Sequence, residues 1–139
     1  MDLIIGGYAQ NKVEYAKNEY SDAILYENLD TNRIIISLKE ENSAKNIIIN
    51  NLQLVIKDFL SAGMKPEDVW QEIKNRMLKL EGYGANLILI SDEIGGGIVP
   101  MDAFDREWRE VTGRILCRLA EQAQKVVRIV MGLPQIIKG

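Results

Sequence analysis

The amino-acid sequence predicts one α/β domain over residues 1–139: a mainly parallel sheet with helices on both faces, in three layers. Short apolar runs alternate along the chain with segments whose apolar residues have helical spacing. The runs are continuous rather than alternating with polar residues, which is typical of strands buried on both faces of a parallel sheet. The length suits a single domain, and no internal repeat or linker divides the chain.

The first half of the chain is expected to alternate strands and helices. Leu3–Ile5 is a short apolar run that ends at Gly6 and Gly7, which predicts a buried strand followed by a turn. Helical spacing of apolar residues predicts a helix over Tyr8–Tyr20. The next expected elements are a strand at Ala23–Tyr26, a turn at Asn28–Asn32, a short strand at Arg33–Leu38, a polar loop at Glu40–Asn46 and a strand at Ile47–Ile49.

The second half continues the alternation. Leu52–Leu60 has one apolar helical face, and Gly63 ends that helix. Pro66 near a first turn predicts the next helix, which ends at Gly82 and Gly84. The remaining expected elements are a strand at Leu87–Ile90, a glycine-rich loop at Ser91–Pro100, one or two helices over Phe104–Lys125 and a last strand at Lys125–Met131. Three strands are expected to be neighbours at the centre of the sheet: Leu3–Ile5, Ile47–Ile49 and Leu87–Ile90.

Composition excludes several classes of function. The formal charge of −3 leaves no broad basic face for a nucleic-acid backbone. No apolar run approaches the ~20 residues that span a bilayer, and no signal peptide is recognised. Cys117 is the single cysteine, so no intrachain disulfide forms, and a cytoplasmic location is expected. The chain has no histidine, which excludes a histidine base, metal ligand or covalent intermediate within it.

A degenerate P-loop motif follows the first strand. A P-loop reads G-x-x-x-x-G-K-[ST] between a strand and a helix, and residues 6–13 read G-G-Y-A-Q-N-K-V. Asn11 stands at the second glycine position, and asparagine tolerates positive φ better than most residues. Lys12 is in register to meet a phosphate, whereas Val13 offers no hydroxyl to Mg²⁺. An ordinary strand–turn–helix is the alternative reading of this segment.

The C-terminal half carries a more specific signal. Residues 87–100 read L-I-L-I-S-D-E-I-G-G-G-I-V-P, followed by D-R-E-W-R-E-V-T-G-R-I-L-C-R-L-A and a closing V-M-G-L-P-Q-I-I-K. From about Asn86 to Lys138 this resembles the adenosylcobinamide kinase/adenosylcobinamide-phosphate guanylyltransferase family of cobalamin biosynthesis. The resemblance implies a P-loop fold, homo-oligomers, a nucleotide ligand such as GTP or ATP, and two nucleotide-dependent reactions on a corrinoid.

The resemblance also implies a set of site residues, several of which depart from the family pattern. The nucleotide-binding candidates are Gly6, Gly7, Asn11, Lys12, Val13, Asn50, Asp92, Glu93 and Gly95, with Lys12 and Glu93 as catalytic candidates. Asn50 stands where the family has an acidic residue, so it brings no charge to Mg²⁺. The family's guanylyl-carrying histidine has no counterpart. No metal site is therefore predicted, and Mg²⁺ is expected to bind weakly.

Each candidate has a simpler alternative. Lys12 can be a surface lysine, Asn50-Asn51 can cap the helix that follows, and Glu93 can be a solvated loop carboxylate. Arg106 and Arg109 share a helix face and are expected to be solvated or paired with nearby acids. Separately, Cys117 is expected to be a core thiol, and Trp70 and Trp108 to lie in the core or an interface.

Three functions stay open. The first is a family member that binds a nucleotide or corrinoid in an accessory or regulatory role, without guanylyltransferase activity. The second is an active cobinamide kinase whose metal site is rearranged around Asp92 or Glu93. The third is a structural oligomer with an empty cleft.

Overall fold

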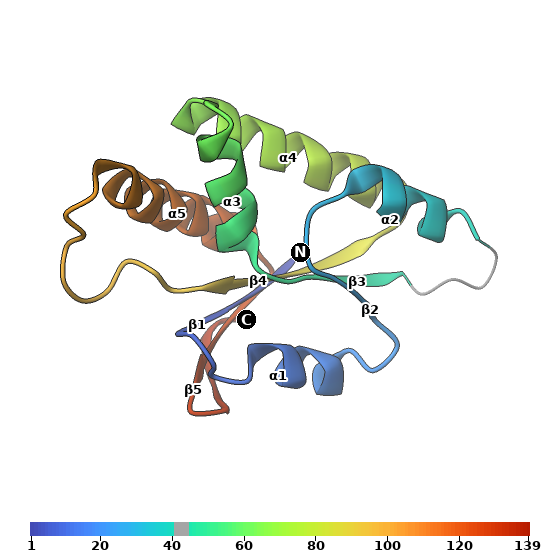
Figure 1. The fold of residues 1–139 in the computed structure, drawn as a ribbon. Coiled ribbons are helices and arrows are strands. Elements are labelled where there is room, and N and C mark those ends of the chain that lie inside the picture. The colour runs from blue at the N-terminus through green and yellow to red at the C-terminus, as the bar shows by residue number, and fades with distance from the viewer. Residues whose placement is uncertain (41–44) are drawn as a thin grey trace.

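The structure is a computed structural model that describes residues 1–40 and 45–139 (Figure 1). Its elements, in chain order, are β1 (Asp2–Gly6), α1 (Lys12–Glu19), β2 (Ile24–Tyr26), α2 (Thr31–Leu38), β3 (Asn46–Ile49), α3 (Leu52–Ser61), α4 (Pro66–Gly82), β4 (Asn86–Asp92), α5 (Ala103–Gln122), β5 (Lys125–Val130) and β6 (Leu133–Lys138). Among these described residues, no helix is both long enough and apolar enough to cross a membrane.

The six strands form one sheet in the order β2-β3-β4-β1-β5-β6. The first five run parallel, and only β6 is antiparallel to its neighbour β5. Leu89 of β4 pairs with Ile49 of β3 on one side and with Leu3 of β1 on the other. The prediction that these three strands are central neighbours is therefore confirmed. Because the strands are parallel, the carboxyl ends of β1 to β4 lie at one edge of the sheet.

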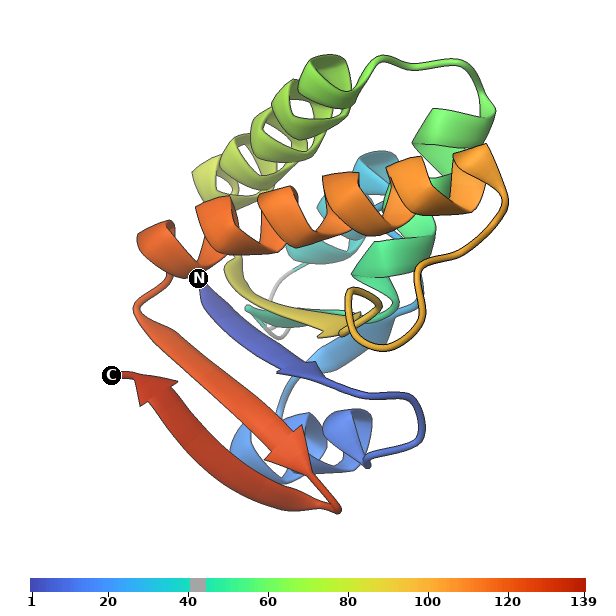
Figure 2. The same cartoon turned by 90° about the vertical axis from the view of Figure 1, so that its left-hand side faces the viewer.

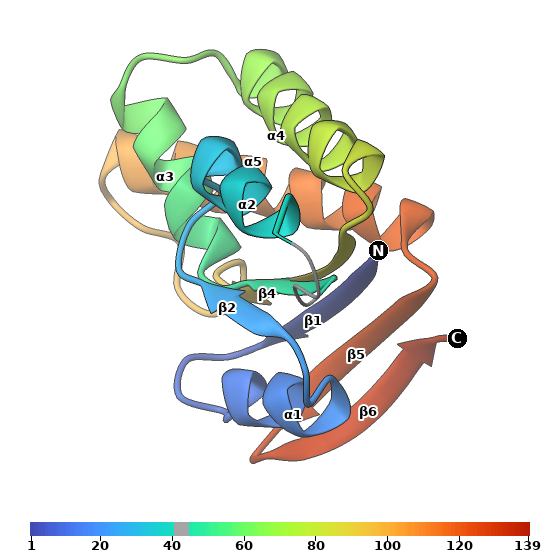
Figure 3. The same ribbon diagram turned by 90° about the vertical axis from the view of Figure 1, so that its right-hand side faces the viewer.

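Helices cover both faces of the sheet, but unequally. α1 lies alone on one face, whereas α2, α3, α4 and α5 lie on the other (Figures 1 and 3). Alternate residues of each buried strand enter different cores: Ile4 packs with Ala16 of α1, whereas Leu3 packs with residues such as Ile115 of α5. Continuous apolar runs were the signal for such double burial, and the predicted three-layer architecture is confirmed.

The prediction of a short strand at Arg33–Leu38 is wrong, because this segment forms α2. The β-branched run favours a strand by propensity. Its buried residues Ile34, Ile35 and Leu38, however, recur at helical spacing. Asp30 also caps the helix, since its carboxylate accepts a hydrogen bond from the backbone N–H of Arg33 at 3.3 Å. The predicted loop at Glu40–Asn46 falls partly on residues 41–44, outside the described residues, and Asn46 already belongs to β3.

The C-terminal region contains the predicted helix and one element that was not expected. The one or two helices predicted over Phe104–Lys125 are a single helix, α5, whose N-cap Asp102 accepts from two backbone N–H groups. The strand β6 was not predicted. It follows a two-residue turn in which Met131 and Gly132 both have positive φ (51° and 77°), the backbone that a tight hairpin requires. Pro134 is tolerated because β6 lies at the edge of the sheet.

Candidate functional site

The loop between β1 and α1, Gly6–Val13 (the N-terminal loop), lies at the carboxyl edge of the sheet. Asn11 adopts the left-handed conformation, with φ 65° and ψ 36°, immediately before α1. The expected role of asparagine as a substitute for glycine is therefore seen in the backbone. Gly6 is required for a different reason. A Cβ there would lie 2.7 Å from the carbonyl oxygen of Ile129 in β5, so close strand packing demands glycine.

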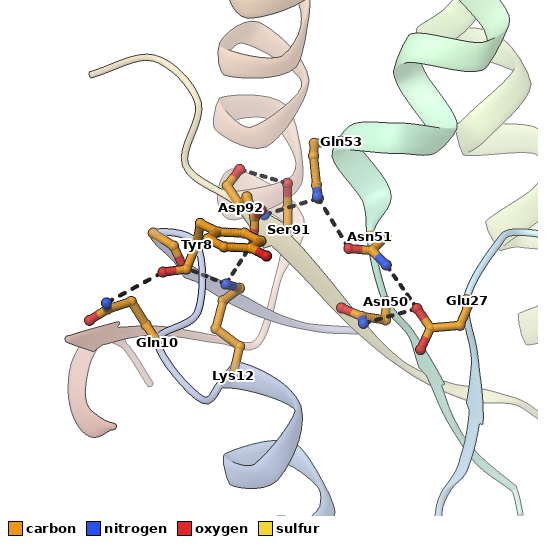
Figure 4. A network of polar contacts seen from close by, with 10 residues as sticks. Tyr8, Gln10, Lys12, Glu27, Asn50, Asn51, Gln53, Ser91 and Asp92 are labelled. Carbon is orange, nitrogen blue, oxygen red and sulfur yellow. Dashed lines mark hydrogen bonds and ion pairs between the residues drawn. The ribbon is translucent and has the colours of Figure 1, made fainter. Parts of the chain in front are cut away.

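Lys12 is an inward-facing lysine, and the alternative of a plain surface lysine is wrong. Its side chain is only 7% exposed. Its Nζ lies 2.7 Å from Oδ1 of Asp92 at the end of β4 and donates to the carbonyl oxygen of Gly7 at 2.6 Å (Figure 4). The one buried cation of the N-terminal loop is thus held at the loop and neutralised by a carboxylate.

A network of hydrogen bonds connects Asp92, at the end of β4, with side chains at the ends of β3 and β2 (Figure 4). The backbone N–H of Asp92 donates to Oε1 of Gln53 at 3.0 Å, and Nε2 of Gln53 donates to Oδ1 of Asn51 at 3.2 Å. Asn50 and Asn51 both donate to Oε2 of Glu27, at 3.0 and 2.8 Å. Gln53 is 4% exposed, so its bonds hold α3 against β4.

Glu27 is a member of this network that the sequence analysis missed. It directly follows β2, so its position at a strand end was the available signal. Its carboxylate explains why Asn50 and Asn51 are amides, since two donors meet one acceptor there. The alternative that Asn50-Asn51 caps α3 is met in position only. Asn51 is the N-cap residue of α3, but its side chain makes no capping hydrogen bond.

A cavity of about 230 Å³ lies beside the N-terminal loop. Its lining residues come from the loop, the start of α1 and the ends of β3 and β4: Tyr8, Ala9, Gln10, Asn11, Lys12, Val13, Glu14, Asn50, Asn51 and Asp92. Sites that bury whole drug-sized ligands measure roughly 300–1,000 Å³. This cavity (the loop cavity) matches a phosphate group or one end of a larger ligand.

Glu93 and Gly95 do not join the loop cavity. The Glu93 carboxylate binds the Arg128 guanidinium of β5 through two hydrogen bonds, at 2.9 and 3.1 Å. It lines a separate cavity beside α5 together with Gly95. Successive residues of a strand point to opposite faces, so Asp92 faces α1 and Glu93 faces α5. The predicted site residues are therefore divided between two cavities, and Gly6 and Gly7 line neither of these two.

The two arginines of α5 bind the backbone of the loop that follows β4. Arg109 donates to the carbonyl oxygen of Ile98 at 2.9 Å and also contacts the carbonyl oxygens of Gly95 and Gly97. Arg106 donates to the carbonyl oxygen of Pro100 at 3.1 Å. The expectation of solvated or acid-paired arginines missed this role, which is to hold the loop.

Three other side-chain expectations have clear outcomes. Cys117 is exposed, so the prediction of a core thiol is wrong. Cys117 lies on the outer face of α5, whereas Leu119 lies on the buried face of the same helix. Trp70 is 6% exposed and lies in the core. Trp108 packs against the same core and donates its indole N–H to the carbonyl oxygen of Gln53 at 2.7 Å.

Comparison with known proteins assigns the family. The sequence profile described as cobinamide kinase / cobinamide phosphate guanyltransferase matches residues 18–137. The chain belongs to this family. The match begins after the N-terminal loop, so the interpretation of that loop depends on its own geometry.

Two curated relatives from the cobinamide kinase / cobinamide phosphate guanyltransferase family are similar to the chain. The bifunctional adenosylcobalamin biosynthesis protein CobU of Escherichia coli (strain K12) is 23% identical over 130 residues, covering 86% of this chain and 66% of the relative. The protein of the same name from Salmonella typhimurium (strain LT2) is 29% identical over 119 residues, covering 84% and 59%. The chain thus spans about two thirds or less of the length of these relatives.

The residues at the loop cavity do not fit a tightly bound Mg²⁺. Magnesium prefers oxygen ligands and one or two carboxylates. Val13 has no oxygen in its side chain, and Oδ1 of Asp92 is already paired with Lys12. Among residues 1–40 and 45–139, no group of three or more Asp, Glu, His or Cys side chains is placed to hold a metal ion. The loop cavity thus presents one ammonium, that of Lys12, which is paired with Asp92, and a second carboxylate, that of Glu14.

Proposed function

We propose that this chain is an accessory or regulatory member of the cobinamide kinase / cobinamide phosphate guanyltransferase family. It binds a phosphate-bearing ligand, a nucleotide such as GTP or a corrinoid phosphate, at the N-terminal loop, and it has no guanylyltransferase activity. It acts in the cytoplasm as a homo-oligomer, the assembly that the family resemblance implies.

The observation that carries the proposal is the Lys12–Asp92 pair. A buried ammonium at a helix N-terminus is a natural partner for a phosphate, and the loop cavity has room for one. In the structure this ammonium forms an ion pair with Asp92, with 2.7 Å between Nζ of Lys12 and Oδ1 of Asp92. An incoming anion must displace this carboxylate, so we expect binding weaker than at an unpaired lysine.

Two features of the chain support the proposal that it transfers neither a guanylyl nor a phosphoryl group. It contains no histidine, so it cannot carry a guanylyl group on one. Phosphoryl transfer depends on positioning and on neutralising charge, for which Mg²⁺ is a major contributor. With Val13 and Asn50 at the positions of expected magnesium ligands, that contribution is lost.

A rearranged kinase is the rival function, and one observation favours it. Glu27 and Asp92 bring two carboxylates to the ends of β2 and β4, on either side of Asn50. In that rival account they replace the missing acidic residue and hold Mg²⁺ with bound nucleotide.

Three assays on the purified chain separate these functions. Incubation with radiolabelled GTP should leave no covalent label, and incubation with cobinamide, Mg²⁺ and ATP or GTP should give no phosphorylated product. Calorimetry should still detect an anion such as pyrophosphate. Lys12→Ala should weaken that binding by about 1–3 kcal/mol, the cost of an unmet charged partner. Product formation would support the rearranged kinase, and absence of any anion or corrinoid binding would support the structural oligomer.

A further inference from the structure

A cavity between α4 and α5 (the α4–α5 cavity) shares no lining residue with the loop cavity. The two helices, yellow-green and orange in Figure 2, lie on the same side of the sheet. The cavity measures about 190 Å³ and is lined by the first two turns of α4 and by successive turns of α5. A cavity of roughly 150 Å³ holds a benzene-sized molecule, so a small organic ligand fits here.

The apolar part of the lining consists of buried core side chains. Trp70 of α4 is 6% exposed, and Val111 and Ile115 of α5 are 5% and 2% exposed. All three belong to the main hydrophobic core. Because close packing holds such side chains in place, the apolar wall of the cavity has a fixed shape.

Arg118 fixes one side of the cavity. Its guanidinium donates two hydrogen bonds to the carboxylate of Glu67 in α4, at 3.3 and 3.2 Å. The same guanidinium lies over the ring of Trp70, 5.3 Å from the ring centroid. Contacts between side chains of α4 and α5 therefore hold the Trp70 ring in position beside the cavity.

The indole N–H of Trp70 is the observation that points to a ligand. It donates to no described residue, although Trp70 is almost entirely buried. Among the described residues, the Thr112 hydroxyl is the only fully shielded side-chain polar group without a partner, so the Trp70 N–H is not fully shielded. Trp70 lines the α4–α5 cavity and is otherwise enclosed by the core, so its N–H opens into this cavity. A buried tryptophan N–H usually finds an acceptor, and here a ligand can supply it.

The charged residues of the lining favour a cation over an anion. Three carboxylates (Glu67, Glu107 and Glu110) and two guanidiniums (Arg114 and Arg118) line the cavity, which leaves one negative charge in excess. Arg118 pairs with Glu67, and Arg114 pairs with Glu110. Glu107 has no ionic partner in the described part of the chain, so its carboxylate is free to bind a cation.

We propose that the α4–α5 cavity binds a short aliphatic molecule with an ammonium group at one end and a hydrogen-bond acceptor at the other. The aliphatic chain packs on Trp70, Val111 and Ile115, and its burial favours binding. The acceptor receives the indole N–H of Trp70, and the ammonium pairs with Glu107. This site does not depend on the function proposed for the N-terminal loop.

Indole N–H signals in NMR spectra of the full chain test the proposal, with ε-aminocaproamide as the probe. The chain has two tryptophans, and Trp108→Phe assigns the remaining signal to Trp70. Without the probe, the Trp70 N–H should exchange with water faster than the Trp108 N–H, which donates to the carbonyl oxygen of Gln53. The probe should shift the Trp70 signal saturably and leave the Trp108 signal in place.

Two variants separate the contributions of the two polar groups, with affinities followed through the methyl signals of Val111 and Ile115. Trp70→Phe keeps an apolar ring and removes the N–H. It should weaken binding of ε-aminocaproamide by about two- to tenfold, but binding of hexylamine, which has no acceptor, should change little. Glu107→Gln should weaken binding of ε-aminocaproamide by about two- to fivefold, but not that of caproamide, which has no ammonium.

Glu121→Gln is the matched control, because it removes a carboxylate of α5 outside the cavity lining. It should leave the affinity for each probe unchanged, and so should Lys12→Ala, which tests the loop cavity separately. The proposal is overturned if the Trp70 signal does not shift saturably, or if its N–H exchanges as slowly as that of Trp108. It is also overturned if Trp70→Phe weakens hexylamine as much as ε-aminocaproamide, or if Glu107→Gln binds ε-aminocaproamide as tightly as the unmodified chain.

Discussion

Asp92→Asn should increase the affinity of the N-terminal loop for anions. The Lys12–Asp92 pair joins atoms 2.7 Å apart, with the two side chains 7% and 19% exposed. A hydrogen bond between charged groups contributes about 1.5–3 kcal/mol. If a phosphate must displace this bond, removing the carboxylate's charge should tighten binding by about tenfold to a hundredfold. Asparagine preserves the backbone N–H that donates to Gln53.

The assay is a calorimetric titration with pyrophosphate at fixed ionic strength. Asp22→Asn is the matched control, because it removes one negative charge near Asn46, at the start of β3 and away from the loop cavity. It should change affinity by less than about twofold, since exposed charges at a distance are screened by salt. Unchanged or weaker pyrophosphate binding by Asp92→Asn would refute the competition argument. Loss of a Mg²⁺-dependent component would instead identify Asp92 as a metal ligand, as the rearranged kinase requires.

Two further changes test the account at other points. Val13→Ser combined with Asn50→Asp should make thermal stability depend on Mg²⁺. The new carboxylate lies beside Glu27, so the melting temperature of the variant should fall without Mg²⁺ and recover with it. The melting temperature of the unmodified chain should not respond to Mg²⁺. Tyr20→Phe should remove an alkaline transition, because burial, followed by the hydrogen bond to Asp2, raises the pKa of Tyr20 above its ordinary value of 10.0. The folded state holds that proton more tightly, so stability is fully present below about pH 10 and falls above it. Thermal melts of Tyr20→Phe across this range should show a smaller decline than those of the unmodified chain, and an equal decline would contradict the assignment.

The fold was largely predictable because its signals are local and agree with one another. Each buried strand, such as Ile47–Ile49, is a continuous apolar run, and parallel order follows from the helices between the strands. The error at α2 occurred where two local signals disagree. Three consecutive isoleucines favour a strand, but the Asp30 cap and burial against the core stabilise a helix. The strand β6 was missed because an exposed edge strand containing Pro134 has no core pattern to detect.

The candidate site was only partly predictable. The inward orientation of Lys12 agrees with its spacing to Gly6, and the positive φ of Asn11 agrees with the residue type. The ion pair with Asp92 could not be predicted, because it depends on which face of β4 each residue occupies. The same cause separates Glu93 from the loop cavity. Side-chain direction at a strand end depends on the register of the sheet, which a single sequence does not give.

The most direct test of the central claim is the magnesium dependence of GTP binding to the unmodified chain. Calorimetric titrations with GTP are compared in the presence of Mg²⁺ and in the presence of a chelator. A ligand-binding member without a metal site should bind GTP weakly and with nearly the same affinity in both conditions, since Val13 offers no oxygen and Asn50 no charge. Tight binding that is lost on chelation, together with turnover on cobinamide, would contradict the account and establish the rearranged kinase.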